Sequence, residues 1–66
     1  MNLIINGEQR AVMDVSTVRD LLQHFQIANK IVVVELNLQI IDREAYDNTI
    51  LQENDRVEIV HFVGGG

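Results

Sequence analysis

One stretch of the sequence has helical periodicity, and this single helix limits the folds open to the chain. Its apolar residues follow the i, i+3, i+4, i+7 spacing of one helical face: Val18, Leu21, Leu22 and Phe25. Thr17 and Asp20 fit a capping box, in which each side chain satisfies a main-chain N–H left free at the helix start. The spacing predicts a helix that ends near Gln26. A chain of 66 residues with one helix must bury it against a sheet.

A hairpin is predicted before the helix. Residues 3–5 are apolar and β-branched in part, and a second extended stretch continues through Val12. Asn6 and Gly7 lie between them, and this pair supplies the positive φ angles that a two-residue hairpin turn requires.

Further strands are predicted after the helix. Residues 31–36 are too few and too β-branched for a second helix, so they predict a strand that is buried over much of its length. Residues 38–41 predict a short edge strand. Polar turns at 42–48 and 52–55 precede a last strand at 57–63.

The predicted order is β-β-α-β-(β)-β, which favours an α+β fold. One helix lying on one face of a mixed sheet of four to five strands buries these pieces economically, with the first and last strands side by side. The β-grasp, the fold of ubiquitin, has this order. We see no linker and no internal repeat, so residues 1–66 are expected to form one domain, with 64–66 as a flexible glycine tail.

Composition excludes several classes of function. Ten acidic against five basic residues give a net charge of −5, which repels nucleic acid and favours partners with basic surfaces. The apolar runs are far shorter than the ~20 residues that span a bilayer, and the start of the chain lacks the basic flank of a signal peptide. We expect a cytoplasmic protein. Cysteine is absent, so no side-chain thiol can carry sulfur.

The last strand presents two faces, because successive side chains of a strand alternate. Glu58 marks the open face of the sheet, and the period of two places Val60 and Phe62 on the same face. Val57 and Ile59 are then expected to face the helix and the core. Two exposed apolar side chains just before the glycines predict a docking patch for another protein.

The terminal glycines point to the chemistry of the chain. Three of its four glycines are the last three residues, Gly64, Gly65 and Gly66. Fully extended, these three residues reach roughly 10 Å beyond the body of the protein. Because glycine has no side chain, this tail is slender enough to enter a narrow channel in another protein. The Gly66 carboxylate, once joined to AMP, is a mixed anhydride that a sulfur nucleophile can attack, which leaves a thiocarboxylate. A frayed terminus or a cloning remnant is the simpler alternative. Neither has a reason to follow directly on a docking patch.

Other candidate residues favour structural roles. His61 could act as a base near the Gly66 carboxylate, but it has the parity of the core face, so we expect a partly buried structural histidine. His24 is expected to be solvated on the polar face of the helix. Tyr46 is expected to anchor a turn onto the body, and Ser16 is a capping residue before it is a nucleophile.

An acidic group lies in the predicted turn after the edge strand: Asp42, Glu44 and Asp47. Metal sites need ligands that converge on one point, and these side chains are scattered along the turn. We therefore favour a solvated loop and assign no metal or bound cofactor to the chain.

The sequence resembles the ThiS-type sulfur carrier proteins of thiamine biosynthesis. The segments that carry the resemblance are Val34-Glu35 with Asn37, Ile40-Ile41, Arg43-Glu44 with Tyr46, and the run from Val57 to Val63 that leads into the glycines. The resemblance implies a cosubstrate that catalyses nothing. A ThiF-type enzyme would use ATP to adenylate the Gly66 carboxylate, a sulfur donor such as a cysteine desulfurase would supply the sulfur, and a ThiG-type thiazole synthase would take it. It also implies that the open face docks on both enzymes.

Other functions stay open at this point. The small subunit of molybdopterin synthase is a similar carrier, although such chains are usually longer. A ubiquitin-like modifier would instead join Gly66 to lysine amines, and a plain interaction module would tolerate loss of Gly65 and Gly66.

Overall fold

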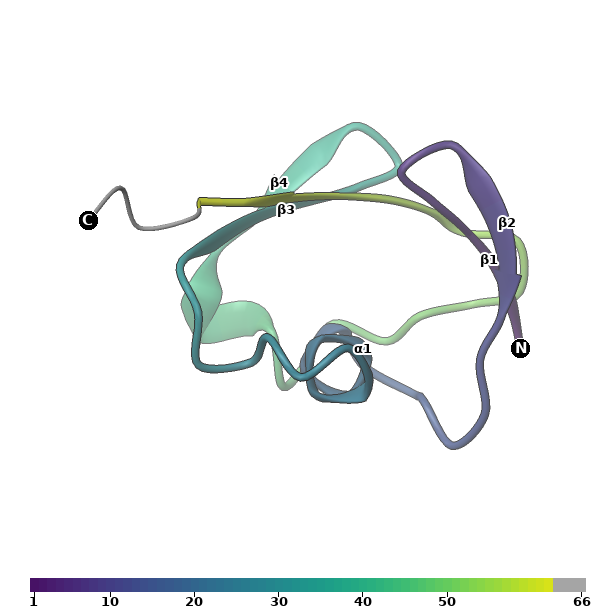
Figure 1. Ribbon diagram of the computed structural model, residues 1–66, viewed down its shortest axis with the longest axis horizontal. Coiled ribbons are helices and arrows are strands. Elements are labelled where there is room, and N and C mark those ends of the chain that lie inside the picture. Colours follow the sequence, from purple (N-terminus) through teal and green to yellow (C-terminus); the bar gives the residue numbers. More distant parts are fainter. Residues whose placement is uncertain (63–66) are drawn as a thin grey trace.

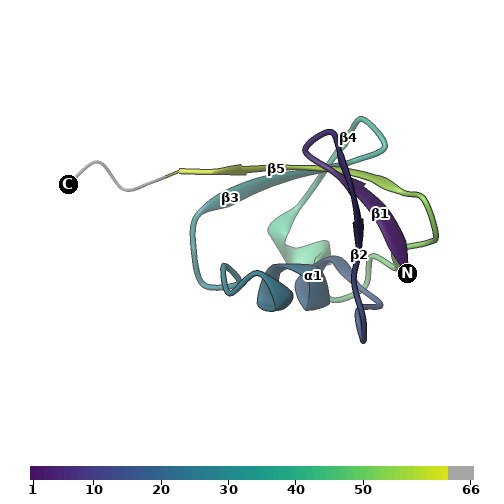
Figure 2. The same ribbon diagram turned by 45° about the vertical axis from the view of Figure 1, so that its right-hand side comes forward.

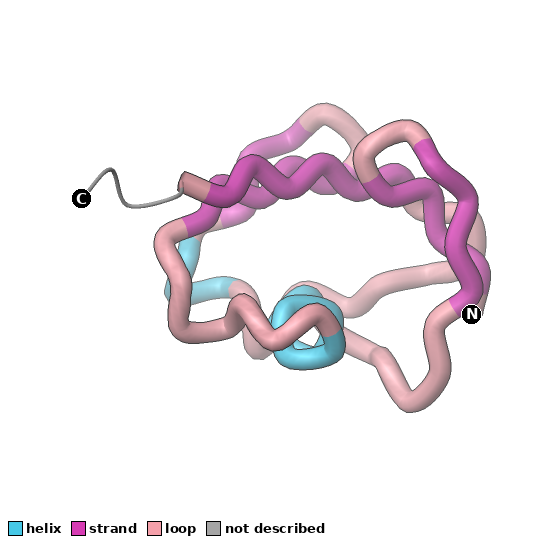
Figure 3. Tube along the Cα trace, in the orientation of Figure 1, coloured by secondary structure: helices cyan, strands magenta, loops and turns pink. Residues whose placement is uncertain are grey.

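The computed structural model describes residues 1–62 and has the predicted order of elements (Figure 1). These are β1 (Asn2–Ile5), β2 (Glu8–Ala11), α1 (Val18–His24), β3 (Val32–Leu36), β4 (Gln39–Ile41), the 3₁₀ helix η1 (Arg43–Ala45) and β5 (Arg56–His61). The sheet lies on one side of the molecule and the helices on the other, as the colouring by secondary structure makes plain (Figure 3). This is the predicted α+β architecture.

The hairpin between β1 and β2 turns where the sequence predicts it. Asn6 and Gly7 have φ angles of 50° and 83°, the left-handed values that a tight hairpin turn requires. The two strands are antiparallel, with Asn2 opposite Ala11 and Ile5 opposite Glu8. The Asn-Gly pair therefore fixes the register of the hairpin.

Helix α1 begins with the predicted capping box. The main-chain N–H of Asp20 donates to the Thr17 hydroxyl, and the Asp20 carboxylate accepts from the N–H groups of Thr17 and Ser16. These two main-chain donors hold the pKa of Asp20 below its ordinary value. The helix ends at His24, and Gln26 follows in a left-handed conformation with φ of 61°. The predicted end near Gln26 is confirmed within the usual spread of helix boundaries.

The strand order in the sheet is β2-β1-β5-β3-β4. Strand β5 is parallel to β1, with Val57 beside Ile5, and antiparallel to β3, with Val34 opposite Ile59. The first and last strands therefore lie side by side, as predicted, and the rotated view shows β5 between β1 and β3 (Figure 2). β5 is the central strand of a mixed sheet.

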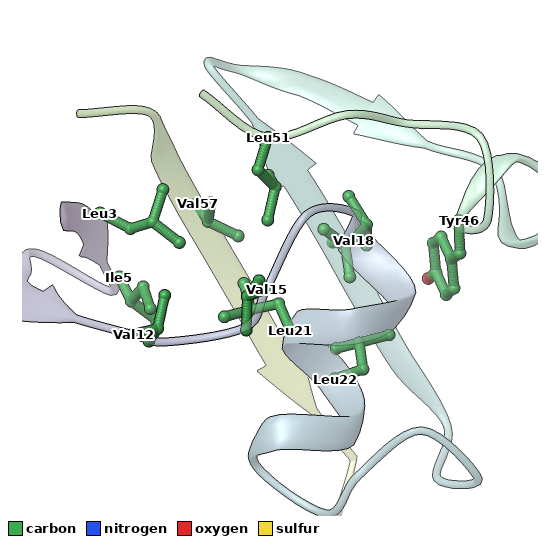
Figure 4. Close-up of a cluster of buried hydrophobic side chains, with 11 residues drawn as sticks. Leu3, Ile5, Val12, Val15, Val18, Leu21, Leu22, Tyr46, Leu51 and Val57 are labelled. Atoms are coloured by element: carbon green, nitrogen blue, oxygen red, sulfur yellow. The ribbon is translucent and has the colours of Figure 1, made fainter. Parts of the chain in front are cut away.

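The core fills the space between the sheet and α1 (Figure 4). Its buried side chains come from strands, helix and loops alike: Leu3, Ile5, Val12, Val15, Val18, Leu21, Leu22, Val34, Tyr46, Leu51 and Val57. Tyr46 anchors the segment after η1 onto the body, as expected. A five-stranded mixed sheet with one main helix on one face is the β-grasp, so the predicted fold class is confirmed.

One prediction about β3 needs correction. Val34 is the one fully buried residue of this strand, the other four are half-buried, and Ile31 lies outside the strand with 71% of its surface exposed. The β-branched run predicts a strand but not its burial, because α1 covers a single face of the sheet. The other face of β3 is part of the open face.

Candidate functional site

The first half of β5 is built into the core. Val57 is completely buried, and Ile59 packs against the same cluster from a partly buried position. Both side chains point towards α1, as the alternation predicts.

Side chains of the opposite parity along β5, and that of the residue after it, face solvent on the other side of the sheet. Val60 and Phe62 are 52% and 54% exposed, and Glu58 is exposed as well. Large apolar side chains held open next to a chain terminus are typical of a docking surface. The predicted face of these three residues is confirmed, and their role in docking stays a prediction.

Strand pairing extends this exposed surface beyond what the sequence predicts. Val33 lies opposite Val60 in the register, and the N–H of Phe62 donates to the carbonyl oxygen of Ile31 across 3.1 Å. Ile40 of β4, 69% exposed, lies opposite Glu35 on the same face. We call this surface the open-face patch; its apolar members are Ile31, Val33, Ile40, Val60 and Phe62. Only the last two follow from the alternation of one strand, because the others depend on the register between strands.

Two carboxylates lie directly opposite each other within this surface. Glu35 of β3 pairs with Glu58 of β5. Like charges directly opposite each other destabilise a sheet, so this pair weakens the fold without an evident structural benefit. Together with the net charge of −5, they favour a partner that brings basic side chains to the open-face patch.

Side-chain amides hold both flanks of β5. Asn6 donates from Nδ2 to the carbonyl oxygen of Ile59 (3.2 Å), and its Oδ1 accepts from the N–H of Ile59 (2.8 Å). On the other flank, Asn37 accepts from the N–H of Arg56 at 3.0 Å. The Asn-Gly turn signal marks Asn6, but nothing local in the sequence predicts that these amides bond to a distant strand.

The two histidines differ in how well the sequence predicts them. His24 is exposed on α1, as expected, with its ring edge-on to Phe25 at 5.1 Å between centroids. His61 lies on the predicted face, but the prediction that it is partly buried is wrong, since the residue is exposed. The alternation of a strand predicts which face a side chain lies on, but not whether other residues cover it. Ile59 packs against the core cluster, whereas His61, on the same face, does not.

The remaining polar candidates have structural roles. Thr17 caps α1. Asp47, in the turn after η1, forms an ion pair with Arg19 of α1. Across residues 1–62, no three His, Cys, Asp or Glu side chains converge in the way that a metal site requires.

Comparison with known proteins decides the family. The sequence model of the ThiS family matches residues 3–66, nearly the whole chain. The chain belongs to the ThiS family. The sulfur carrier protein ThiS of Bacillus subtilis is 53% identical over 65 residues, which are 97% of this chain and 98% of that protein.

Two further comparisons extend the ThiS assignment. The crystal structure of the thiamine biosynthesis protein ThiS from Geobacter metallireducens is 39% identical, covers 100% of both chains and has a TM-score of 0.82. The thiazole synthase of Paramagnetospirillum magneticum is 39% identical over 66 residues, although this chain spans 20% of that protein's length. A ThiS-like segment therefore forms part of that longer protein.

The three glycines of this ThiS-family chain lie outside the described residues, as does Val63. The prediction that Gly66 carries sulfur, with Gly64 and Gly65 as its tail, therefore rests on the sequence. What the structure adds is the strand that leads to them, with the open-face patch along its last described residues.

Proposed function

We propose that this chain is the sulfur carrier protein of thiamine biosynthesis and that its cargo is held at the terminal carboxylate of Gly66. The observation that carries the proposal is that the ThiS family match runs through residue 66 and so includes the glycines. As a ThiS-family member the chain is a carrier and not a catalyst. Its similarity to ThiS proteins favours thiazole formation over molybdopterin synthesis.

The proposed chemistry activates the carboxylate in two steps. A carboxylate oxygen of Gly66 attacks the α-phosphorus of ATP, pyrophosphate leaves, and an acyl adenylate forms. Hydrosulfide then attacks the acyl carbon and expels AMP, which leaves a thiocarboxylate; where a persulfide attacks instead, a thiol of the partner enzyme must also reduce the S–S bond of the acyl disulfide to release the thiocarboxylate. The absence of cysteine supports this route, because the chain has no thiol on which sulfur could travel.

The proposed partners are enzymes that supply what the carrier lacks. Thiazole synthase is supported by the Paramagnetospirillum protein, in which a segment similar to this chain belongs to the same polypeptide. A ThiF-type adenylating enzyme and a sulfur donor such as a cysteine desulfurase are required by the chemistry. The open-face patch would dock on the enzymes, with Phe62 and Val60 as apolar anchors and Glu58 meeting a basic side chain.

The location of the protein remains part of the proposal. No helix within residues 1–62 has the length and apolar character needed to cross a bilayer. We propose that the carrier works in the cytoplasm, where its partner enzymes would have ATP.

Removal of Gly65 and Gly66 tests the function. The shortened chain, the full chain and buffer alone are each mixed with the adenylating enzyme, ATP, a sulfur source and thiazole synthase, and thiazole formation is measured. We expect product only with the full chain. The shortened chain should have an unchanged Tm, because the core lies within residues 3–57. Equal thiazole formation by the two chains would contradict the proposal.

A further inference from the structure

The end of β5 has a main-chain edge that the fold leaves open. In the antiparallel pairing with β3, the N–H of Phe62 bonds to Ile31, and residues of an antiparallel pair alternate between bonded and non-bonded positions. His61, opposite Val32, is therefore in a non-bonded position. Its N–H and C=O point away from β3, towards the side on which β1 lies.

On that side the internal pairing stops two residues earlier. The N–H of Asn6 donates to the carbonyl oxygen of Val57 at 2.9 Å, and the Asn6 side chain bonds to both main-chain groups of Ile59. The chain then turns back at Gly7, where the space beside the Cα is open. β5 continues past this hairpin (Figure 1). Within residues 1–62, the main-chain N–H and C=O of His61 have no hydrogen-bond partner.

A concavity of about 180 Å³ adjoins this edge on the face towards α1. Four apolar residues, Ile5, Phe25, Ile27 and Ile59, form most of its lining. Three polar residues complete it: Asn6, Arg10 and His61. The Arg10 guanidinium lies 5.5 Å from the centroid of the Phe25 ring. An apolar hollow with the Arg10 guanidinium at its side fits an aliphatic side chain flanked by a carboxylate.

We propose that an extended segment of thiazole synthase pairs with β5 at His61 and continues the sheet where β1 ends. An aliphatic side chain of that segment occupies the concavity, and an acidic side chain lies beside Arg10. The inference rests on the proposed function and adds a second contact to it, at the edge of the sheet and not on the open-face patch. Strand pairing on both sides of β5 fixes the direction in which the chain leaves Phe62. That direction sets where the Gly66 carboxylate arrives in the partner.

Two substitutions at one position test the pairing. His61→Pro removes the N–H of the open edge, and because that group makes no bond to β3, proline is tolerated there as at other strand edges. His61→Ala keeps the N–H and removes the ring. We expect His61→Pro to weaken the affinity for thiazole synthase about tenfold and His61→Ala to weaken it less than about threefold. Equal affinities of the two variants, both with wild-type Tm, would overturn the proposal.

Amide hydrogen exchange provides a test that needs no substitution. In the free chain the His61 amide should exchange faster than the amides of Val60 and Phe62, which face β3. In the complex with thiazole synthase the His61 amide should become protected at least tenfold. Unchanged exchange of this amide in a complex that forms and transfers sulfur would overturn the edge pairing alone. Absence of any complex with the wild-type chain would instead refute the proposed function.

Charge reversal tests the predicted acidic neighbour. Arg10→Glu should weaken binding about fivefold, and more at low than at high salt, because the effect is electrostatic. Arg43→Glu makes the same change of charge on η1, outside the concavity, and should leave the affinity within about twofold. An equal effect of both variants would contradict a carboxylate beside Arg10.

Discussion

Apolar residues recur along the whole of β5, but they are buried or partly buried in its first half and exposed in its second half. From Arg56 to Ile59 the strand has β1 and then the Asn6 side chain on one side and β3 on the other, and Val57 is completely buried. From Val60 to Phe62 the chain pairs with β3 alone and its apolar side chains are more than half exposed. The same alternation of side chains therefore leads to burial in one half and exposure in the other, because the neighbouring strands and α1 determine which side chains are covered. The first half holds the fold, and the second half leaves its apolar side chains exposed, as the proposed docking requires.

The same substitution in each half should separate the two halves most strongly. Val57→Asp places a carboxylate in the core and should cost more than about 4 kcal/mol, enough to unfold a chain this short. Val60→Asp should change the free energy of unfolding by less than about 1 kcal/mol. Denaturant titration followed by circular dichroism measures both. A folded Val57→Asp variant, or an unfolded Val60→Asp variant, would contradict the claim that only the first half of β5 is needed for the fold.

Phe62→Asp tests the partner side of the comparison. Loss of an exposed aromatic anchor and addition of a negative charge should weaken binding to the adenylating enzyme or to thiazole synthase at least tenfold, while the fold survives. Met13→Asp adds the same charge at a residue that is 78% exposed and outside the open-face patch, so it serves as the control. Calorimetry gives the affinities. Unfolding of the Phe62→Asp variant would mean that Phe62 belongs to the core.

Asn6 marks the boundary between the halves, and its substitution should sharpen that boundary. Asn6→Ala loses two hydrogen bonds to Ile59 and places alanine at a φ of 50°, so we expect a loss of about 2 kcal/mol in the free energy of unfolding. Asn6→Gly loses the same bonds but accepts the positive φ, and should cost about 1 kcal/mol. Thermal unfolding measures the difference. Wild-type stability of both variants would show that β5 needs no support from this side chain.

Acid should lower the free energy of unfolding by a small amount, through the carboxyl groups of Asp20 and Glu53. Main-chain N–H groups of Ser16 and Thr17 lower the pKa of Asp20, and the N–H of Asn2 lowers that of Glu53. A carboxyl with a lowered folded pKa stabilises the fold above its unfolded pKa, so this stability is lost as the pH falls below about 4.5. Asp20→Asn should show a smaller drop in the free energy of unfolding between pH 6 and pH 3 than the wild type. An equal drop would contradict the role of Asp20.

Local signals in the sequence predict the parts of this structure that depend on local physics. The Asn6-Gly7 turn, the Thr17 cap and the faces of Val57 and Phe62 each follow from residues a few positions apart. The exposure of His61 does not, because it depends on which distant residues cover the sheet.

The wider open-face patch shows the same limit. Ile31 and Ile40 join it through the register of β3 with its neighbours, which no single strand encodes. The opposition of Glu35 and Glu58 likewise exists only once the strands pair. For the candidate site, the sequence predicts the terminal group and one strand, whereas the surface that partners would meet requires the folded sheet.

The intact mass of the carrier after activation tests the central claim most directly. The full chain and a chain without Gly65 and Gly66 are incubated with the adenylating enzyme, ATP and a sulfur source, and each is weighed by mass spectrometry. We predict that the full chain gains the difference between one sulfur and one oxygen atom, located by fragmentation at Gly66, and that the shortened chain keeps its mass. An unchanged full chain, or a sulfur found on any other residue, would contradict the account.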